Sequence, residues 1–332
     1  MAPGAAEGLP AAPPVLEPDT RAGFVVAVDV GGSLTKIGVV GRDGRLGAVE
    51  RLTTHLEDGS DGLVRWVAEQ VTRVAVGQGD RPCLGYGVVV PGVIDSATGT
   101  VRAAPNVGWF DVPLGPRLTE LTRLPGVVGH DVRGGGLAEW RLGGGVGVDN
   151  LLFLPLGTGI AGALVVDGRL LEADGYAGEI GHIRVSAAED LVCACGQRGC
   201  LETVASAAGV ARSYARLAGP APSGALVDAR EVAERARFGD PAAMQAFARA
   251  VDALAEALLV YLSLLGPELV VVGGGLSGAA DLLLPPIQEL LEARVAFQRV
   301  PRLVPARLGA DAGVVGAGLL GWDHVRGGSA DD

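Results

Sequence analysis

The sequence predicts an α/β protein made of two similar lobes. Its 332 residues correspond to about two domains, at ~100–200 residues each. A unit of apolar strand, glycine-rich turn and second strand occurs twice, at 24–40 and at 151–166. Around these units, short β-branched runs alternate with segments of helical periodicity. Two such lobes would hold a nucleotide in the cleft between their glycine turns.

The first half of the chain alternates strands with helices. Its strands are apolar, β-branched runs bounded by glycine turns, and Arg42–Gly44 forms a hairpin between two of them. Asp61 is expected to cap a helix whose apolar residues share one face. In order, we expect strands at 24–30, 36–40, 46–54 and 127–128, a buried strand within 84–95 that ends in a loop, and helices at 61–75 and 131–140.

The second half repeats the opening unit and then becomes mainly helical. Residues 172–203 are irregular and rich in Gly, Cys and His, and 219–227 reads as a Pro/Gly loop. A strand over 269–276 runs into a glycine turn. We expect helices at 206–218, 229–237, 241–265, 280–295 and 311–321, and a last strand near 302–308.

The composition excludes several classes of protein. Apolar residues make up 48% and charged residues 20% of the chain, so a sizeable core can form. The net charge of −11 argues against a nucleic-acid surface. No apolar run is long and unbroken enough to span a membrane. Residues 1–22 do not read as a secretion signal, and we expect a disordered tail there and a cytoplasmic protein with reduced cysteines.

Two glycine turns are candidate phosphate-binding loops. In Asp29-Val-Gly31-Gly32-Ser33 the glycines would let backbone N–H groups approach an anion, with a hydroxyl as a further donor. Asp29 at the strand end could hold Mg²⁺. An ordinary hairpin explains this turn equally well, and it is not a Walker A loop. Gly157-Thr158-Gly159 is a weak signal alone and gains weight from the first turn.

The cysteines form the strongest local signal. Cys193, Cys195 and Cys200 fall within eight residues, with His182 upstream. Three thiolates and one imidazole make a closed tetrahedral zinc site, which would be structural because no ligand position stays open. The alternatives are bystander thiols or a disulfide. Cys83 lies far from the cluster, in a predicted strand, and we expect it in the core.

A second group of polar residues suits a polyhydroxyl ligand. Asp131 follows a short apolar strand, where a carboxylate can act as general base toward a bound hydroxyl. A capping role at the start of the following helix is the simpler explanation. Asn106, Glu179, His182 and Glu202 lie in glycine-rich or loop segments, but their spacing alone does not bring them together.

Taken together, these motifs resemble the ROK family (repressors, open reading frames and sugar kinases) of the actin-like ATPase, or ribonuclease H-like, fold. They occur in the family's order and cover residues 24–321. The matching segments are Asp29-x-Gly-Gly-Ser33, Pro91-Gly-x-x-Asp95, Pro105-Asn-Val-Gly-Trp109, Asp131 with Ala138-Glu139, Gly157-Thr-Gly159, Glu179-x-Gly-His182, Cys-x-Cys-Gly-x-x-Gly-Cys-x-Glu at 193–202 and Gly273-Gly-Gly275.

The resemblance implies an ATP-dependent, glucokinase-like sugar kinase that uses Mg²⁺ and a structural Zn²⁺. Asp131 would deprotonate the sugar 6-hydroxyl, and His182, Cys193, Cys195 and Cys200 would hold the zinc. The residues implied to bind the sugar are Asn106, His130, Glu179, His182 and Glu202. Those implied to bind ATP and its metal are Asp29, Gly31, Gly32, Ser33, Thr35, Gly157, Thr158, Gly159, Gly274 and Gly275.

One segment departs from the family pattern. The family usually has Asn-Asp-Ala-Asn around the base, and this chain has His130-Asp131-Val132-Arg133. A His changes the shape and donor pattern beside the reacting hydroxyl. Arg133 adds a cation that could lower the pKa of Asp131 or contact phosphate. The substrate could therefore be glucose, an amino sugar or a C7 cyclitol of secondary metabolism.

Two other classes of function remain as alternatives: a sugar-responsive repressor of the same family, and a sugar-binding protein without catalysis. Only about 23 residues precede the first strand, too few for a winged helix-turn-helix. We expect an N-terminal lobe over 23–140 that includes the last helix, 311–325, and a C-terminal lobe over 141–310 with the zinc knuckle. The resemblance also implies a homodimer.

Overall fold

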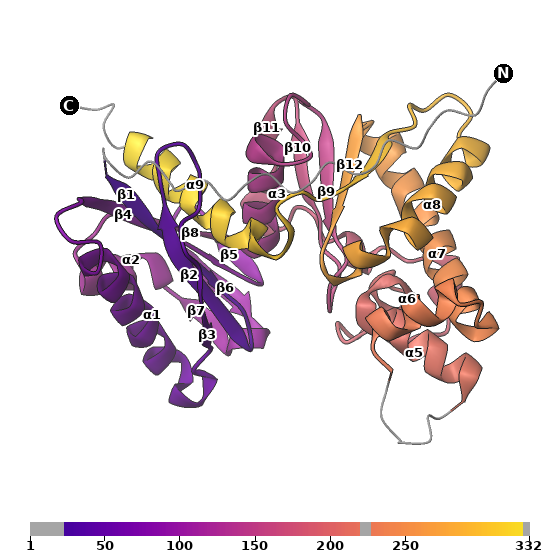
Figure 1. Cartoon of the computed structure of the whole chain (residues 1–332), viewed down its shortest axis with the longest axis horizontal. Coiled ribbons are helices and arrows are strands. Elements are labelled where there is room, and N and C mark those ends of the chain that lie inside the picture. Colours follow the sequence, from indigo (N-terminus) through magenta and orange to yellow (C-terminus); the bar gives the residue numbers. More distant parts are fainter. Residues whose placement is uncertain (1–22, 220–226, 328–332) are drawn as a thin grey trace.

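The computed structural model describes residues 23–219 and 227–327. Two five-stranded sheets organise this part of the chain, in the orders β3-β2-β1-β4-β8 and β11-β10-β9-β12-β13. In both sheets an antiparallel three-stranded meander continues into two parallel strands. The predicted strand–turn–strand units form the centre of each sheet, so the two-lobed α/β fold is confirmed (Figure 1).

The elements have the following bounds. The first sheet consists of β1 (Phe24–Val30), β2 (Leu34–Val40), β3 (Glu50–Thr53), β4 (Cys83–Val90) and β8 (Gly126–His130). The second consists of β9 (Leu151–Pro155), β10 (Ala163–Val166), β11 (Arg169–Leu170), β12 (Leu269–Gly273) and β13 (Arg302–Pro305). A small third sheet consists of β5 (Val93–Asp95), β6 (Thr100–Ala104) and β7 (Trp109–Val112). The helices are α1 (Gly59–Val76), α2 (Leu114–Thr122), α3 (Asp131–Leu142), α4 (Glu202–Ala205), α5 (Ala207–Ala218), α6 (Ala229–Arg237), α7 (Pro241–Leu265), α8 (Ala280–Arg294) and α9 (Ala312–Gly327).

Both faces of the first sheet are buried. Successive strand residues point to opposite faces, so Val26 and Val28 of β1 belong to the core shared with α1 and α2. Val25 and Ala27 pack instead against α9. The last helix of the described chain therefore covers the first sheet, far from it in sequence and close in space (Figure 1).

The second sheet is covered in the same way. Leu152 and Leu154 of β9 face the large core formed with α5 to α8, whereas Leu151 and Phe153 pack with residues of α3. Figure 1 shows α3 between the two lobes, where it also packs against α9. The helices cross so closely that a Cβ added to Gly316 would lie 1.9 Å from the backbone oxygen of Gly134. Glycine is the only residue type that allows this contact.

Several predicted boundaries are wrong. Asp61 does not cap α1, because the helix begins earlier, at Gly59, and Asp61 lies in its first turn, paired with Arg117 at 2.6 Å. The segment 84–95 does not end in a loop as expected: the chain turns at Gly92 with φ 106°, and β5 follows β4. The strands expected at 46–54 and 302–308 are shorter, and α2, β6 and β7 were not predicted.

Other expectations fall outside this description or agree with it. The tail 1–22 and most of the loop 219–227 lie outside the described residues. Cys83 begins β4 and packs, partly buried, against the core of the first lobe. Over the ranges 23–219 and 227–327, no helix has both the length and the apolarity to cross a membrane.

Candidate active site

A cavity of about 570 Å³ brings the two predicted glycine turns to one space. Its lining consists of Asp29, Gly31, Gly32, Ser33, Leu34, Lys36, Asn106 and Thr158. The first turn joins β1 to β2, and Thr158 lies in the turn that joins β9 to β10. Each lobe therefore contributes its central hairpin to the same cavity, and Asn106 joins them from the segment between β6 and β7.

The first turn is held by its own backbone and by two buried threonines. The Gly31 N–H donates to the Leu34 oxygen at 3.1 Å, and the Thr54 hydroxyl donates to the Gly31 oxygen at 2.7 Å. Thr35 is fully buried, with its hydroxyl 2.9 Å from that of Thr54. Thr35 therefore does not line the cavity as the phosphate-binding expectation required. It supports the turn from behind, through Thr54.

Asp29 and Lys36 both line this cavity and form an ion pair. They are direct partners in the β1–β2 register, and Lys36 Nζ lies 3.3 Å from Asp29 Oδ2. Lys36 also donates to the backbone oxygen of Ala310. Burial raises the pKa of Asp29 to about 6, against the opposing effect of Lys36. Lys36 was missed from the sequence, although the hairpin spacing already placed it opposite Asp29.

His130 and Asp131 mark the junction of β8 and α3. His130, not Asp131, is the N-cap residue: its Nδ1 accepts the N–H groups of Val132 at 3.2 Å and Arg133 at 3.4 Å. Burial lowers the pKa of His130 to about 3, so the ring is neutral, and Nε2 then carries the proton. The capping explanation considered for Asp131 therefore applies chiefly to its neighbour.

The Asp131 carboxylate remains partly open. It accepts the Val132 N–H at 2.7 Å and exposes 34% of its side chain. Burial raises the pKa of Asp131 above its ordinary value, although the Val132 N–H, Arg133 and Lys36 oppose the rise. The Asp131 charge in turn raises the pKa of Asp29. The two carboxylates and Lys36 thus share one electrostatic site.

Arg133 was expected to lower the pKa of Asp131 or to contact phosphate, and the structure shows a different position. Its guanidinium does not line the cavity of the glycine turns. It is buried and donates to the backbone oxygens of Gly175 at 3.1 Å and Ala177 at 3.5 Å. Its effect on the pKa of Asp131 has the expected downward direction, but burial of that carboxylate is the larger effect and the pKa rises.

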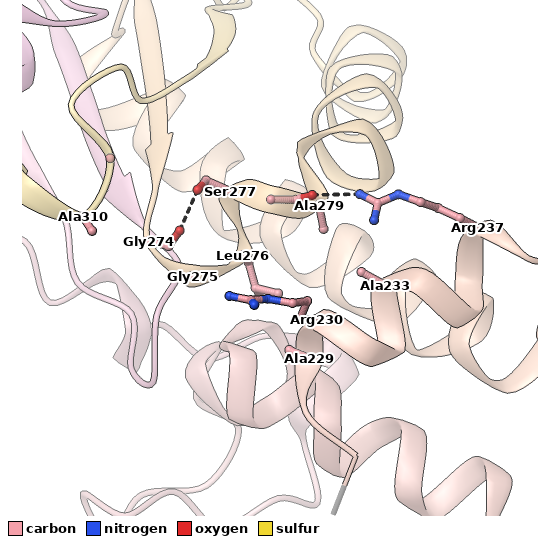
Figure 2. Close-up of a pocket in the computed structure, with 12 residues that line it drawn as sticks. Ala229, Arg230, Ala233, Arg237, Gly274, Gly275, Leu276, Ser277, Ala279 and Ala310 are labelled. Atoms are coloured by element: carbon pink, nitrogen blue, oxygen red, sulfur yellow. Dashed lines mark hydrogen bonds between the residues drawn. The ribbon is translucent and has the colours of Figure 1, made fainter. Parts of the chain in front are cut away.

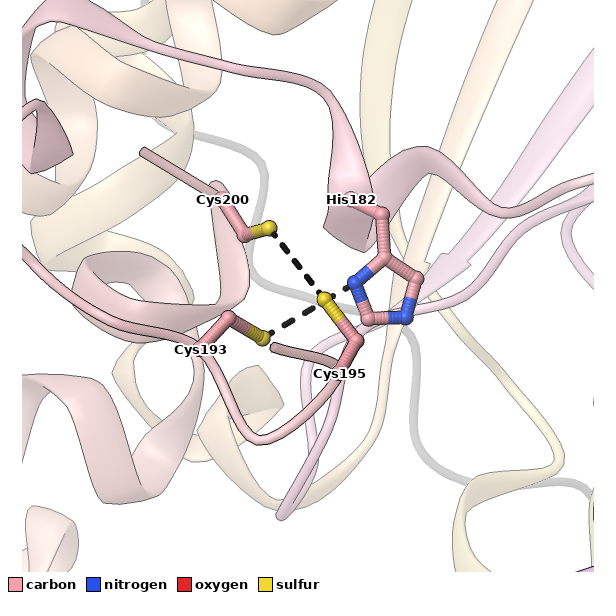
Figure 3. A group of neighbouring side chains, drawn as sticks. All are labelled: His182, Cys193, Cys195 and Cys200. Atoms are coloured by element: carbon pink, nitrogen blue, oxygen red, sulfur yellow. Dashed lines mark hydrogen bonds between the residues drawn. The ribbon is translucent and has the colours of Figure 1, made fainter. Parts of the chain in front are cut away.

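The cysteine cluster is assembled as expected. Ligand atoms of His182, Cys193, Cys195 and Cys200 all lie within 4.8 Å of one another, and Figure 3 shows them turned toward a common centre. The Sγ atoms of Cys195 and Cys200 are 3.7 Å apart, and Cys193 Sγ is 3.9 Å from His182 Nδ1. A tetrahedral Zn²⁺ with Zn–S bonds of ~2.3 Å requires edges of about 3.8 Å. The donor set therefore fits zinc.

His182 links this cluster to the polar residues outside it. Its Nδ1 faces Cys193, while its Nε2 lies 3.8 Å from a carboxylate oxygen of Glu179. Glu202 instead accepts the Ile160 N–H at 2.9 Å, and its other oxygen lies 4.0 Å from Cys193 Sγ. Glu202 therefore ties the second glycine turn to the cluster, and a Cβ on Gly159 would collide with it at 2.6 Å.

A second cavity, of about 410 Å³, lies at the glycine turn after β12. Gly274 and Gly275 line it together with α6 residues that include Arg230 and Arg237 (Figure 2). Arg237 is held by Asp281 and by the Gly278 oxygen, whereas the Arg230 side chain extends toward Gly275. Arg230 was not predicted as a site residue, because an arginine on a helix carries no local signal of a pocket.

Comparison with known proteins finds relatives that match along most of the chain. The sequence profile of the ROK family matches residues 25–323. The chain is 36% identical to a glucokinase of Halalkalibacterium halodurans, over 90% of this chain and 94% of that protein. It is 35% identical to a glucokinase of Thermotoga maritima, over 91% and 98%.

A solved structure has the same fold. The ROK family glucokinase from Streptomyces griseus, in complex with glucose and AMPPNP, superposes with a TM-score of 0.77 at 29% identity. The match covers 91% of this chain and all of that one. The family profile matches nearly all described residues, and the glucokinase relatives are 35–36% identical over 90–91% of this chain, so the chain belongs to the ROK family.

Proposed function

We propose that this protein transfers the γ-phosphoryl group of ATP to the primary, 6-position hydroxyl of a hexose, with Asp131 as the general base. The observation that carries the proposal is the single cavity to which both glycine turns, Asp29 and Asn106 contribute. Asp131 lies within the electrostatic field of that cavity. Phosphoryl transfer needs mainly positioning and charge neutralisation, and such a cavity can supply both.

The relatives independently support a sugar kinase activity, without regard to the hydroxyl that is phosphorylated. The chain is an ATP-dependent sugar kinase, as expected of a ROK protein whose glucokinase relatives match over 94% and 98% of their own length. In the proposal, the first turn with Ser33 and the second with Thr158 bind the ATP phosphates, and the turn at Gly274 and Gly275 lies near the adenosine. Asp29 offers the oxygen ligand that Mg²⁺ prefers, and a bound Mg²⁺ would neutralise phosphate charge.

Replacing Gly274 tests the assignment of the adenosine site. Gly274 has φ 78°, and an added Cβ would lie 2.6 Å from the backbone of Leu156. Gly274→Ala is therefore expected to distort the turn at a cost of about 1–3 kcal/mol and to raise KM for ATP about tenfold. Gly327→Ala in α9 is the control, because Gly327 lies outside this cavity and its added Cβ meets no atom of the described residues within 4 Å. An unchanged KM in the Gly274 variant would remove ATP from this cavity.

We propose that the sugar, the phosphoryl acceptor, binds next to Asp131 on the side opposite the ATP phosphates. Glu179 and the Nε2 atom of His182 are adjacent and partly exposed, so both can bind sugar hydroxyls. The Nε2 proton of His130 is a further donor, since its Nδ1 is occupied by backbone N–H groups. Asn106 contributes from the cavity lining, and Glu202 contributes mainly by holding the second glycine turn.

Zinc at the cysteine cluster is proposed as a structural ion. Its four protein ligands leave no position for a substrate, so the ion would orient His182 and stiffen the segment that carries Glu179. The lobe boundaries given above, the homodimer and the cytoplasmic location are likewise proposals that follow from the family.

The base assignment predicts the acid limb of the pH profile. Asp131 accepts a proton only as a carboxylate, and burial raises its pKa above the ordinary 3.8. Activity should therefore be lost, as pH falls, at a higher pH than for an ordinary aspartate. Lys36 lowers this pKa, so Lys36→Met should move the limb further upward. The measurement is kcat/KM against pH for both proteins; a limb that moves downward in the variant would contradict the assignment.

A kinase for an amino sugar or a C7 cyclitol is the alternative, and His130 and Arg133 motivate it. The test is an ADP-release assay with ATP and Mg²⁺ over glucose, mannose, N-acetylglucosamine, N-acetylmannosamine, glucosamine and C7 cyclitols. Robust turnover of glucose supports the proposal. Turnover confined to an amino sugar or a cyclitol supports the alternative, and silence with intact sugar binding indicates a binding protein.

A further inference from the structure

Arg133 is buried with one side of its guanidinium incompletely bonded. It exposes only 3% of its surface. Nη1 donates to the backbone oxygens of Gly175 and Ala177, but Nη2 has no hydrogen-bond partner among residues 23–219 and 227–327. Buried polar groups are almost always bonded, and a guanidinium can only donate. The missing partner is therefore a group with an acceptor atom.

The position of Arg133 points to the acceptor side of the site. It lies in the first turn of α3, two residues after the proposed base Asp131. The loop oxygens that hold it belong to residues 175–177, which lead directly into Glu179. Asp131, Glu172 and Glu179 all attract its charge. The guanidinium thus lies in the field of both the proposed base and a proposed sugar ligand.

We propose that Arg133 is a specificity-determining residue whose Nη2 donates a hydrogen bond to an oxygen of the phosphoryl acceptor. A hydroxyl or carbonyl oxygen accepts this bond, whereas an ammonium group is repelled by the cation and has no acceptor atom. The favoured acceptor therefore carries oxygen, not a free amine, at the position that Arg133 reaches. This inference rests on the proposed kinase function and narrows it: amino sugars with a free amine there are disfavoured.

A purely structural role is the competing explanation. Ala173 and Asp174, just before the bonded oxygens, have φ of 46° and 52°, and in this explanation Arg133 serves only to hold a strained loop. Such a role would affect all acceptors in the same proportion. A role in specificity changes the ratio between acceptors.

The experiment compares Arg133→Asn, Arg133→Gln and Arg133→Lys with the unaltered protein. The acceptors are glucose and its 2-, 3- and 4-amino-deoxy analogues, assayed below the pKa of their amines, together with a C7 cyclitol and its amino analogue. For the unaltered protein, replacing the hydroxyl by an ammonium group at one ring position should lower kcat/KM about 100-fold, mainly through a higher KM. In the Arg133→Asn and Arg133→Gln variants this preference for oxygen should be at least tenfold smaller. The Arg133→Lys variant should keep most of it. Arg249→Asn is the matched control, because Arg249 also donates to a loop oxygen, that of Ala187, and should leave every ratio unchanged.

The outcomes separate this inference from the proposed function. Turnover with identical ratios in all variants would overturn the role of Arg133 and leave the kinase intact. Equal losses for every acceptor, matched by a lower Tm, would assign Arg133 to the loop alone. No turnover of any acceptor by the unaltered protein would overturn the proposed function, and this inference with it.

Discussion

Replacing Asp131 by Asn is expected to reduce kcat for sugar phosphorylation by about 10²–10⁴-fold, the usual contribution of a general base. Asn preserves the shape of the side chain and can still accept the Val132 N–H, but it cannot take a proton from the attacking hydroxyl. The sugar should therefore bind within about tenfold of its normal affinity while turnover is lost. Steady-state kinetics and calorimetric titration with sugar measure the two effects separately.

A matched control separates this effect from a general change of charge. Asp61→Asn removes a carboxylate that is exposed, lies in α1 and pairs with Arg117. It should leave kcat unchanged, because an exposed ion pair contributes little. Undiminished turnover in Asp131→Asn would remove Asp131 as the base, and loss of sugar binding together with turnover would assign it to binding.

Replacing Cys195 by Ser is expected to reduce bound zinc and thermal stability together. A serine hydroxyl replaces one of three thiolates in the cluster, and the binding free energy of a structural ion is part of the folding free energy. The expected fall in Tm is about 5 °C or more, since each kcal/mol corresponds to ~2–4 °C in a protein of this size class. Mass spectrometry of the metal content and scanning calorimetry make the measurement.

Cys83 provides the control for this substitution. It begins β4, packs against the core of the first sheet, and its Sγ donates to the Gly85 oxygen at 3.5 Å. Cys83→Ser should leave the metal content unchanged. A strong chelator should reproduce the effect of Cys195→Ser on the unaltered protein. Native, fully active protein without metal would exclude the zinc site.

The sequence predicted what depends on local pattern. Both hairpin units, the long helix over 241–265 and the cysteine cluster are encoded by residues close to one another in the chain. The elements α2, β6 and β7 were not predicted. They are short, so each contains too few residues for a clear periodic pattern. Asp61 shows the weakness of a cap assignment from residue type alone, since a cap depends on where the helix begins.

The sequence identified many of the residues in the candidate site, but it did not predict what each side chain contacts. Thr35 has a hydroxyl in the expected turn, yet β2 directs it into the core, where it bonds to Thr54. Arg133 follows the proposed base, Asp131, by two residues, and only the folded loop at 175–177 determines where its guanidinium lies. Such outcomes depend on strand alternation and on distant backbone, which no local motif contains.

The crossing of α3 and α9 has a consequence for how this protein tolerates mutation. Gly316 is distant in sequence from every proposed site residue, yet any side chain there meets the Gly134 oxygen one turn from Asp131. In a saturation-mutagenesis screen, position 316 should therefore be as intolerant as the proposed base, Asp131. Gly327 ends the same helix, and an added Cβ there meets no atom of residues 23–219 and 227–327 within 4 Å, so this position should accept most residues. The screen would thus show a second position, besides the proposed base, at which substitutions abolish function. The cause there is the contact between two helix backbones and not a catalytic role.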